Sequence, residues 1–204
     1  MAHADTLRKI HLETSHFILR TIEPGDASPE WTLWRKDPIA ARMLNAPQRD
    51  ISVEEIREYI AGFDGQSSHL LGIFDKENGA LIGIRAIYVD WQRKEFVVNV
   101  LVGETAARGK GARTETRDVI YNYLFEELRL ETARCSILAH NTDVLRIMDE
   151  NGWQHIDTSY KPSASGGAPV ELRHFSLSRE ENRRGEQARA LRNATKVRAQ
   201  TTRR

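Results

Sequence analysis

Apolar and polar positions along this chain follow two periods, a two-residue alternation typical of strands and a spacing of three or four residues typical of helices. Runs rich in β-branched and aromatic residues predict seven strands, over 17–20, 70–74, 81–89, 96–102, 133–139, 153–160 and 170–177. Apolar residues at helical spacing predict helices over 26–44 with a break before Pro38, over 52–63, over 114–128 and over 143–150. This mixed order of elements predicts a single α/β domain.

Two of these helices carry recognisable signals at their ends. Ser52 and Glu55 form the pattern of a capping box, in which each side chain binds the backbone N–H of the other residue. Asn151 and Gly152 follow the helix over 143–150, where a left-handed residue commonly ends a helix. The pattern therefore predicts where one helix begins and where another ends.

The segment between the strand over 96–102 and the next helix is rich in backbone donors. Arg108-Gly109-Lys110-Gly111 places glycines, which let a backbone approach a ligand closely, at the start of a helix. The first N–H groups of a helix have no intrahelical partner, and the helix dipole is positive at that end. The segment therefore predicts a site for an anionic group such as phosphate.

Two common phosphate motifs do not fit this segment. Gly111 stands where a Walker A motif needs the magnesium-binding hydroxyl of Ser or Thr. A dinucleotide fingerprint needs a third glycine at the position of Thr114, followed by an acidic residue about twenty residues further on, and neither is present. The sequence thus excludes both the P-loop and the Rossmann interpretation.

The flanks of the segment resemble the GCN5-related N-acetyltransferases, which use acetyl-CoA. The pyrophosphate loop of that family follows the pattern Q/R-x-x-G-x-G/A, which Arg108 to Arg113 matches except at the last position. Tyr123 to Leu128 is similar to the subgroup of ribosomal-protein and polyamine acetyltransferases. The segment from Asn141 to Trp153 resembles that subgroup's second signature, an Asn, a short helix and a Gly-aromatic pair. The resemblance in element order extends over residues 12–178.

This resemblance implies a fold, a cofactor and a set of contacts. The fold is a mixed α/β (α+β) domain whose mostly antiparallel sheet has six to seven strands, with helices on both faces. Acetyl-CoA is expected to lie in a split between two central strands, with the strand before the loop on its pantetheine arm and the loop on its pyrophosphate. The residues expected to bind acetyl-CoA are Leu101, Val102, Gly103, Arg108, Gly109, Lys110, Gly111, Ala112, Arg113 and Asn141.

Three positions depart from the family pattern. Arg113 occupies the last place of the loop, where the family has Gly or Ala. Met148 stands where many relatives carry a Tyr that protonates the CoA thiolate, and Val144 stands where the subgroup often has Ser. Neither usual acid is therefore present.

Acetyl transfer to an amine requires a neutral amine, a donor for the developing oxyanion and a proton for the leaving thiolate. In an extended strand, Glu95 and Asn99 share one face, so both are predicted to line an acceptor cleft, with Glu95 as general base. Tyr160 is a candidate acid. A purely surface role for Glu95, and deprotonation of the amine by water, remain as alternatives.

Composition excludes several other classes of protein. The chain has 204 residues, of which 40% are hydrophobic, enough for one core. Its 30 basic and 29 acidic residues leave a formal charge of +1, so nucleic-acid binding is not expected from the global field. Cys135 is the only cysteine, which excludes an intrachain disulfide, and its apolar neighbours predict a buried thiol. The seven histidines form no metal-binding pattern.

The distribution of apolar residues predicts where the protein is located and where its domain ends. No run approaches the ~20 apolar residues of a membrane span, and the N-terminus lacks the apolar core of a signal peptide, so we expect no membrane association and a cytoplasmic protein. Residues 1–178 are predicted to form the acetyltransferase domain. Residues 179–204 are rich in arginine and poor in apolar residues, and we predict a disordered or helical tail there.

The sequence thus predicts an acetyl-CoA-dependent N-acetyltransferase that acts on a primary amine of a small molecule, such as an amino sugar, a polyamine or an amino acid. Acetylation of a protein N-terminus or of lysine is one alternative. A catalytically silent acyl-CoA-binding module is another, motivated by Arg113, Val144 and Met148. Members of the family often dimerise, and a homodimer is possible for this chain.

Overall fold

A single eight-stranded sheet, in the order β1-β2-β3-β4-β5-β6-β8-β7, forms the centre of the protein. The structure is a computed structural model, and it describes residues 9–34, 36–47, 49–103 and 111–189. Neighbouring strands are antiparallel except β5 and β6, which are parallel. The strands are β1 (His11–Glu13), β2 (Phe17–Thr21), β3 (Ser68–Asp75), β4 (Leu81–Asp90), β5 (Glu95–Val102), β6 (Thr132–Leu138), β7 (Gln154–Lys161) and β8 (Val170–Ser178).

The helices lie where the apolar spacing predicts them. They are α1 (Pro29–Trp34), α2 (Pro38–Leu44), α3 (Val53–Ala61), α4 (Ala112–Asn122) and α5 (Thr142–Glu150), and a 3-10 turn (Pro24–Asp26) precedes α1. Asp37 caps α2 because its side chain accepts hydrogen bonds from the first backbone N–H groups, and Pro38 follows at the first helical position. The predicted capping box is confirmed, since Ser52 and Glu55 bind each other's backbone N–H at the start of α3.

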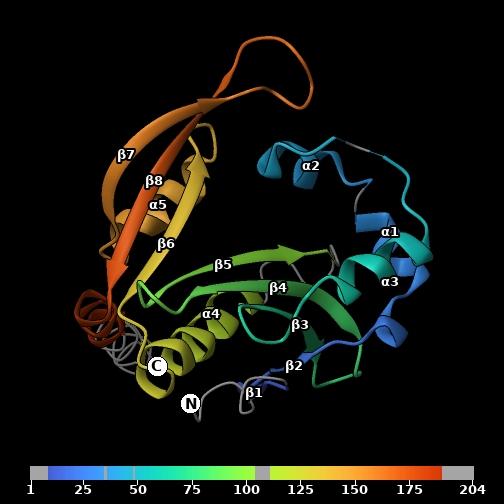
Figure 1. Cartoon of the computed structure of the whole chain (residues 1–204), viewed down its shortest axis with the longest axis horizontal. Helices are drawn as coiled ribbons and strands as arrows, with labels where there is room; N and C mark the ends of the chain where they lie inside the picture. The colour runs from blue at the N-terminus through green and yellow to red at the C-terminus, as the bar shows by residue number, and fades with distance from the viewer. Residues whose placement is uncertain (1–8, 35, 48, 104–110, 190–204) are drawn as a thin grey trace, which may run out of the picture.

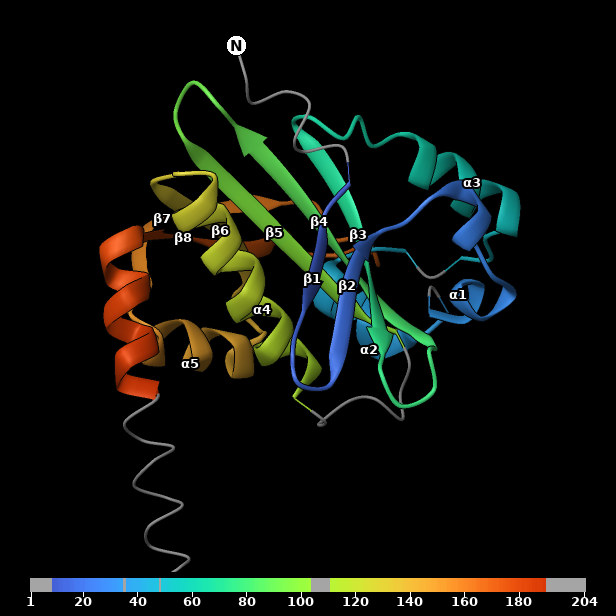
Figure 2. The ribbon, with the colours of Figure 1, turned by 90° about the horizontal axis from the view of Figure 1, so that it is seen from below.

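Two hydrophobic cores cover opposite faces of the sheet. The alternation of β4 supplies both, because Ile87 and Val89 belong to the first core while Ile84 and Ala86 belong to the second. The first core lies under α4 and α5, and the second lies under α1 and α3, on the other side of the strands in Figure 2. Helices therefore cover both faces, as the sequence predicted.

The sheet opens into a fork between β5 and β6. These strands pair only over Glu95–Thr132, Phe96–Ala133 and Val97–Arg134. Beyond Val97, the described residues of β5 have no partner in β6, and Figure 1 shows β6 rising away from β5. The split that the family resemblance implied is therefore present between two central strands.

The sheet has one strand more than the seven that the pattern predicts. The additional strand, β1, has three residues and pairs with β2 at the edge of the sheet. A strand this short cannot show a two-residue alternation, so its place is decided by the backbone pairing of His11 with Arg20 and of Glu13 with Ile18.

The described beginning of the C-terminal segment is helical. Residues 179–189 form a helix directly after β8, and it lies beside α4 and α5 in Figure 2. The buried Asn182 accepts a hydrogen bond from Arg117 of α4, and Arg189 pairs with Asp118 of the same helix. The first part of the arginine-rich segment is thus a packed helix, and residues 190–204 lie outside the described residues.

Candidate active site

The two sides of β5 are distinct at the fork. Val98 and Val100 pack against the core under α4, whereas Leu101 packs against the core under α1 and α3. Glu95 and Asn99 are therefore on the side of Leu101, as the alternation predicts. We call this side of the sheet, where no described helix covers β6, β8 and β7, the open face.

Helix α4 begins after its N-cap residue, Gly111, which follows the segment that leaves β5. Gly111 has a φ of 85°, in the left-handed region that favours glycine, and the helix has no side-chain cap there. The N–H of Thr114 donates to the carbonyl of Gly111, whereas the N–H groups of Ala112 and Arg113 have no acceptor among the described residues and could bind an anion. Ala112 is buried in the first core, and the side chain of Arg113 is exposed.

A buried arginine lies beneath this first turn. Arg85 is 3% exposed, although it belongs to the otherwise apolar strand β4. Its Nε donates to Thr116 Oγ1 over 3.0 Å, and its Nη2 donates to the backbone carbonyl of Arg113. Burial lowers the pKa of Arg85 to about 9, which leaves the group charged at neutral pH. No carboxylate among the described residues forms an ion pair with Arg85.

A buried cation without a carboxylate partner is costly, so a compensating negative charge is expected nearby. The uncapped start of α4 is the adjacent position that accepts one. Arg85 and the helix N-terminus together fit an anionic group such as a pyrophosphate. Of the expected loop residues, Gly111, Ala112 and Arg113 are at this position, while Arg108, Gly109 and Lys110 lie outside the described residues.

The end of β5 meets α1 closely. Gly103 donates its N–H to the carbonyl of Ile82 in β4, so the preceding residue, Val102, directs its backbone groups toward the fork. A Cβ atom at Gly103 would lie 1.9 Å from the ring of the buried Trp34. The absence of a side chain at Gly103 therefore lets α1 pack on the strand end. Leu101, Val102 and Gly103 lie together at the end of β5, well past its last pair with β6.

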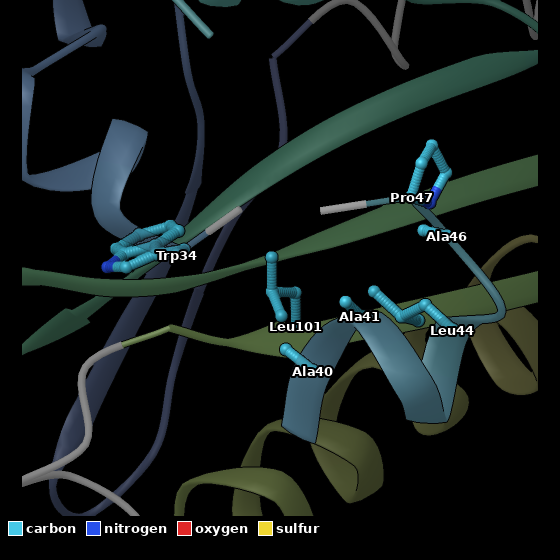
Figure 3. A pocket seen from close by; sticks show the side chains of 7 residues that line it. All are labelled: Trp34, Ala40, Ala41, Leu44, Ala46, Pro47 and Leu101. Carbon is cyan, nitrogen blue, oxygen red and sulfur yellow. The ribbon is translucent and has the colours of Figure 1, made fainter. Parts of the chain in front are cut away.

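A small apolar hollow adjoins this strand end on the open face. Its volume is about 10 Å³, room for about one water molecule. Figure 3 shows Leu101 of β5 and Trp34 of α1 on one side and α2 with the following residues on the other. The lining residues are Trp34, Ala40, Ala41, Leu44, Ala46, Pro47 and Leu101.

Asn141 lies across the fork, where β6 leads into α5. It is the N-cap residue of α5, yet its side chain makes no capping hydrogen bond. Among the described residues, none has a hydrogen bond to its side-chain amide. The contact of this amide with the pantetheine arm, which the family resemblance implies, stays a prediction.

Of the three catalytic candidates, two are on the open face. Glu95 lies at the closed end of the fork, where Arg134 of β6 binds its carboxylate over 2.6 Å. Asn99 is exposed and lies just past the last paired residue, where the strands begin to separate. The structure thus places Asn99 closer than Glu95 to the strand end with Leu101. Glu95 as general base stays a prediction.

Tyr160 is not brought together with these residues. Its side chain is 68% exposed on the edge strand β7. Its neighbour Ser159 bonds to His174 on the open face, so the alternation of β7 turns Tyr160 to the opposite side. Met148, which stands where many relatives have a tyrosine, has a packing role. It lies against the first core, with its sulfur 3.8 Å from that of Cys135.

The structure adds candidate site residues that the sequence did not single out. Arg85 had a detectable signal, because a lone charge inside the apolar run Leu81–Val89 is unusual for a strand buried on both faces. Ser136 and His174 gave no signal in the sequence, because they become neighbours only through the pairing of β6 with β8. Asn45 bonds to the β7–β8 loop through both ends of its amide, and only the tertiary structure shows that contact.

Two further properties concern the described residues alone. No group of three or more His, Cys, Asp or Glu side chains converges there as a metal site. No helix in the same part of the chain is long and apolar enough to cross a membrane.

A comparison with known families identifies the class of protein. The acetyltransferase (GNAT) domain family matches residues 16–154, well over half of the chain. The chain therefore belongs to the GNAT acetyltransferase family. It is an acyltransferase that uses acetyl-CoA. Among the curated proteins, none matches the chain.

Solved structures share this fold at low sequence identity. The spermidine N-acetyltransferase from Vibrio cholerae, in complex with CoA and spermine, has a TM-score of 0.71 and 15% identity, over 83% of this chain and 99% of that one. The ribosomal-protein-S5-alanine acetyltransferase from Vibrio fischeri has a TM-score of 0.69 and 14% identity, over 83% and 96%. A GCN5-related N-acetyltransferase from Brucella melitensis has a TM-score of 0.72 and 15% identity, over 88% and 83%. These likenesses confirm the fold.

Proposed function

We propose that this acetyltransferase transfers the acetyl group of acetyl-CoA directly to a primary amine of a small molecule, of the amino sugar, polyamine or amino acid class. The observation that carries the proposal is a bridge across the open face. Asn45, at the end of α2, donates to the carbonyl of Pro162 over 3.0 Å and accepts from the N–H of Ala164 over 2.8 Å. Both partners belong to the β7–β8 loop.

This bridge favours a compact acceptor over a long peptide. It joins two elements that flank the open face, and His140 of the β6–α5 turn adds a contact to the carbonyl of Arg42 in α2. The charges on the open face near the fork are mixed, since Glu95 is paired with Arg134. A basic peptide would need an acidic groove, which this pairing does not provide.

Residues around the fork would make the contacts with acetyl-CoA. The start of α4 with Arg85 beneath it would hold the pyrophosphate, together with the loop from Arg108 to Arg113. The backbone of Leu101 to Gly103 and the side chain of Asn141 would hold the pantetheine arm. The thioester would then lie between Asn99 and the apolar hollow, so that an amine approaches from the open face.

Calorimetric titration with acetyl-CoA tests the cofactor assignment. The native chain should bind with micromolar affinity, and an Arg108→Ala, Gly111→Asp double variant should lose binding because it places a carboxylate against the pyrophosphate. Native binding that persists in the double variant would contradict the assignment of the pyrophosphate to this turn.

An acceptor screen tests the substrate class. Acetyl-CoA turnover is measured with spermidine, glucosamine, free amino acids and a peptide that begins with alanine. Turnover with a small amine, reduced in Asn45→Ala, would support the proposal. Turnover with the peptide alone would establish the protein-directed alternative, and acetyl-CoA binding without turnover on the panel would favour a silent binding module.

A further inference from the structure

Three polar side chains from neighbouring strands form a hydrogen-bonded chain across the open face. Ser136 Oγ of β6 lies 2.8 Å from His174 Nδ1 of β8, and Ser159 Oγ of β7 lies 2.6 Å from His174 Nε2. A neutral imidazole has one acceptor nitrogen and one N–H donor. Both contacts are satisfied when the Ser136 hydroxyl donates to Nδ1 and the Nε2 hydrogen is donated to Ser159.

This chain begins at the point where the fork opens. Val97 and Arg134 are the last paired residues of β5 and β6. Two positions further along each strand, on the same face, are Asn99 and Ser136, and both are exposed. Cys135 packs against the first core under α4 and α5, so the alternation of β6 turns Ser136 to the open face.

A hollow of about 570 Å³ lies on the open face beside the chain. Ser136 and His174 line it, and so do the paired side chains of Glu95 and Arg134. It is wide enough for a small molecule and lies against the strand that borders the fork. The remaining lining residues are Arg93, Cys135, Ile156, Asp157 and Phe175.

We propose that Ser136 and His174 receive the proton that the acceptor amine loses. This inference rests on the proposed function, and it adds the residues that accept the proton. The amine would reach the fork from this hollow, with Asn99 on one side and Ser136 on the other. Histidine is the most frequent general base in enzymes, and Glu95 is already bound by Arg134.

The transfer step replaces the C–S bond of the thioester with a C–N bond to the amine. The amine nitrogen forms the new C–N bond to the acetyl carbon, and the C–S bond breaks with its electron pair on sulfur. The amine proton passes to Ser136 Oγ while the Ser136 hydroxyl proton passes to His174 Nδ1, which gives an imidazolium. The CoA thiolate takes up a proton from solvent, and the imidazolium later returns its extra proton to solvent.

Charged side chains from each neighbouring strand lie near His174. Asp157 of β7 is paired in register with His174. Arg134 comes from β6, Glu95 from β5 and Arg93 from the β4–β5 turn, and all four side chains line the hollow. These four side chains carry two negative and two positive charges. The test therefore compares variants at His174 itself.

The test compares His174→Gln and His174→Ala with the native chain. Turnover is measured across pH on the panel of spermidine, glucosamine, amino acids and alanyl peptide. We expect kcat to fall about 100-fold, the usual contribution of a general base, with acetyl-CoA affinity and melting temperature near native values. Added imidazole should restore part of the activity of His174→Ala, which a purely structural role would not permit.

His155→Gln is the matched control, because His155 lies on the neighbouring strand and its ring contacts Phe175 instead of the hydroxyl chain. It should keep native kcat. Ser136→Ala should lower kcat as His174→Gln does. Native kcat and an unchanged pH profile in His174→Gln would overturn this inference alone, whereas a native chain that binds acetyl-CoA but turns over no acceptor would overturn the proposed function and this inference together.

Discussion

At the scale of single residues, Arg85 has the most unusual environment in the described structure. Its guanidinium is buried within a hydrophobic strand and donates to a hydroxyl and to a backbone carbonyl. Neither partner neutralises a positive charge. The buried charge therefore costs stability in the free protein and is expected to be balanced when an anionic cofactor binds.

The first prediction follows from that balance. Arg85→Met should weaken acetyl-CoA binding roughly 10- to 100-fold, because a charge-assisted contribution is typically about 1.5 to 3 kcal/mol. The melting temperature of the free protein should stay the same or rise, since an apolar side chain needs no desolvation. Arg57→Met, at an exposed position of α3, is the control and should bind normally. Equal affinities would contradict the role of Arg85.

His69 supports a second prediction, on pH. The residue is 2% exposed, its Nδ1 has no hydrogen-bond partner among the described residues, and burial lowers its pKa from the ordinary value of 6.5. The unfolded chain therefore takes up a proton at a higher pH than the folded chain, so stability falls as pH drops below 6.5 toward the lowered pKa. Melting temperatures should fall less steeply with pH in His69→Gln than in the native chain. Parallel curves would contradict this prediction.

At the scale of elements, the contact between α1 and the end of β5 positions the fork. Trp34 lies against the backbone of Gly103, and the same indole lines the apolar hollow beside Leu101. The packing of α1 and the position of the end of β5 are therefore coupled. A side chain at position 103 cannot be accommodated without moving one of them.

A third prediction measures this coupling. Gly103→Ala should destabilise the protein by about 1 to 3 kcal/mol, the usual cost of overpacking, and should raise KM for acetyl-CoA. Gly25→Ala is a matched control, because a Cβ atom there meets nothing within 4 Å. Denaturant unfolding of both variants provides the comparison. A native midpoint in Gly103→Ala would show that α1 can shift without cost.

At the scale of the whole molecule, the C-terminal helix joins the helices behind the sheet. Arg183 pairs with Glu126 after α4, Arg189 with Asp118 of α4, and Arg179 donates to the carbonyl of Leu130. This helix therefore supports α4, whose first turn is the proposed site of the pyrophosphate. The domain boundary after residue 178 stays a prediction, as do the homodimer and the cytoplasmic location.

Truncation provides the fourth prediction. A chain ending at Ser178 should melt at least about 5 °C below the native chain, since the loss of these contacts is expected to cost roughly 2 kcal/mol. A chain ending at Arg189 keeps the described contacts and should melt near the native temperature. Equal melting temperatures for the two truncated chains would place the end of the folded domain at 178, as the sequence predicted.

The sequence alone predicted nearly all elements and the family. The seven predicted strands and the helices follow from local periodicity and from end signals such as Ser52 and Glu55, which act within a few residues. The resemblance of the loop and of the Asn141 segment indicated the family, which the family comparison confirms. These features were predictable because their information is contiguous in the chain.

Only the tertiary structure decided what meets across the fork. Strand pairing brings Ser136, His174 and Ser159 together, and it sets Glu95 against Arg134 at the closed end. Burial of Arg85 depends on α4 lying over β4, because Thr116 and the backbone of Arg113, both in α4, supply its hydrogen-bond partners. Pairing register and helix packing join residues far apart in sequence, and a local pattern holds no information about either.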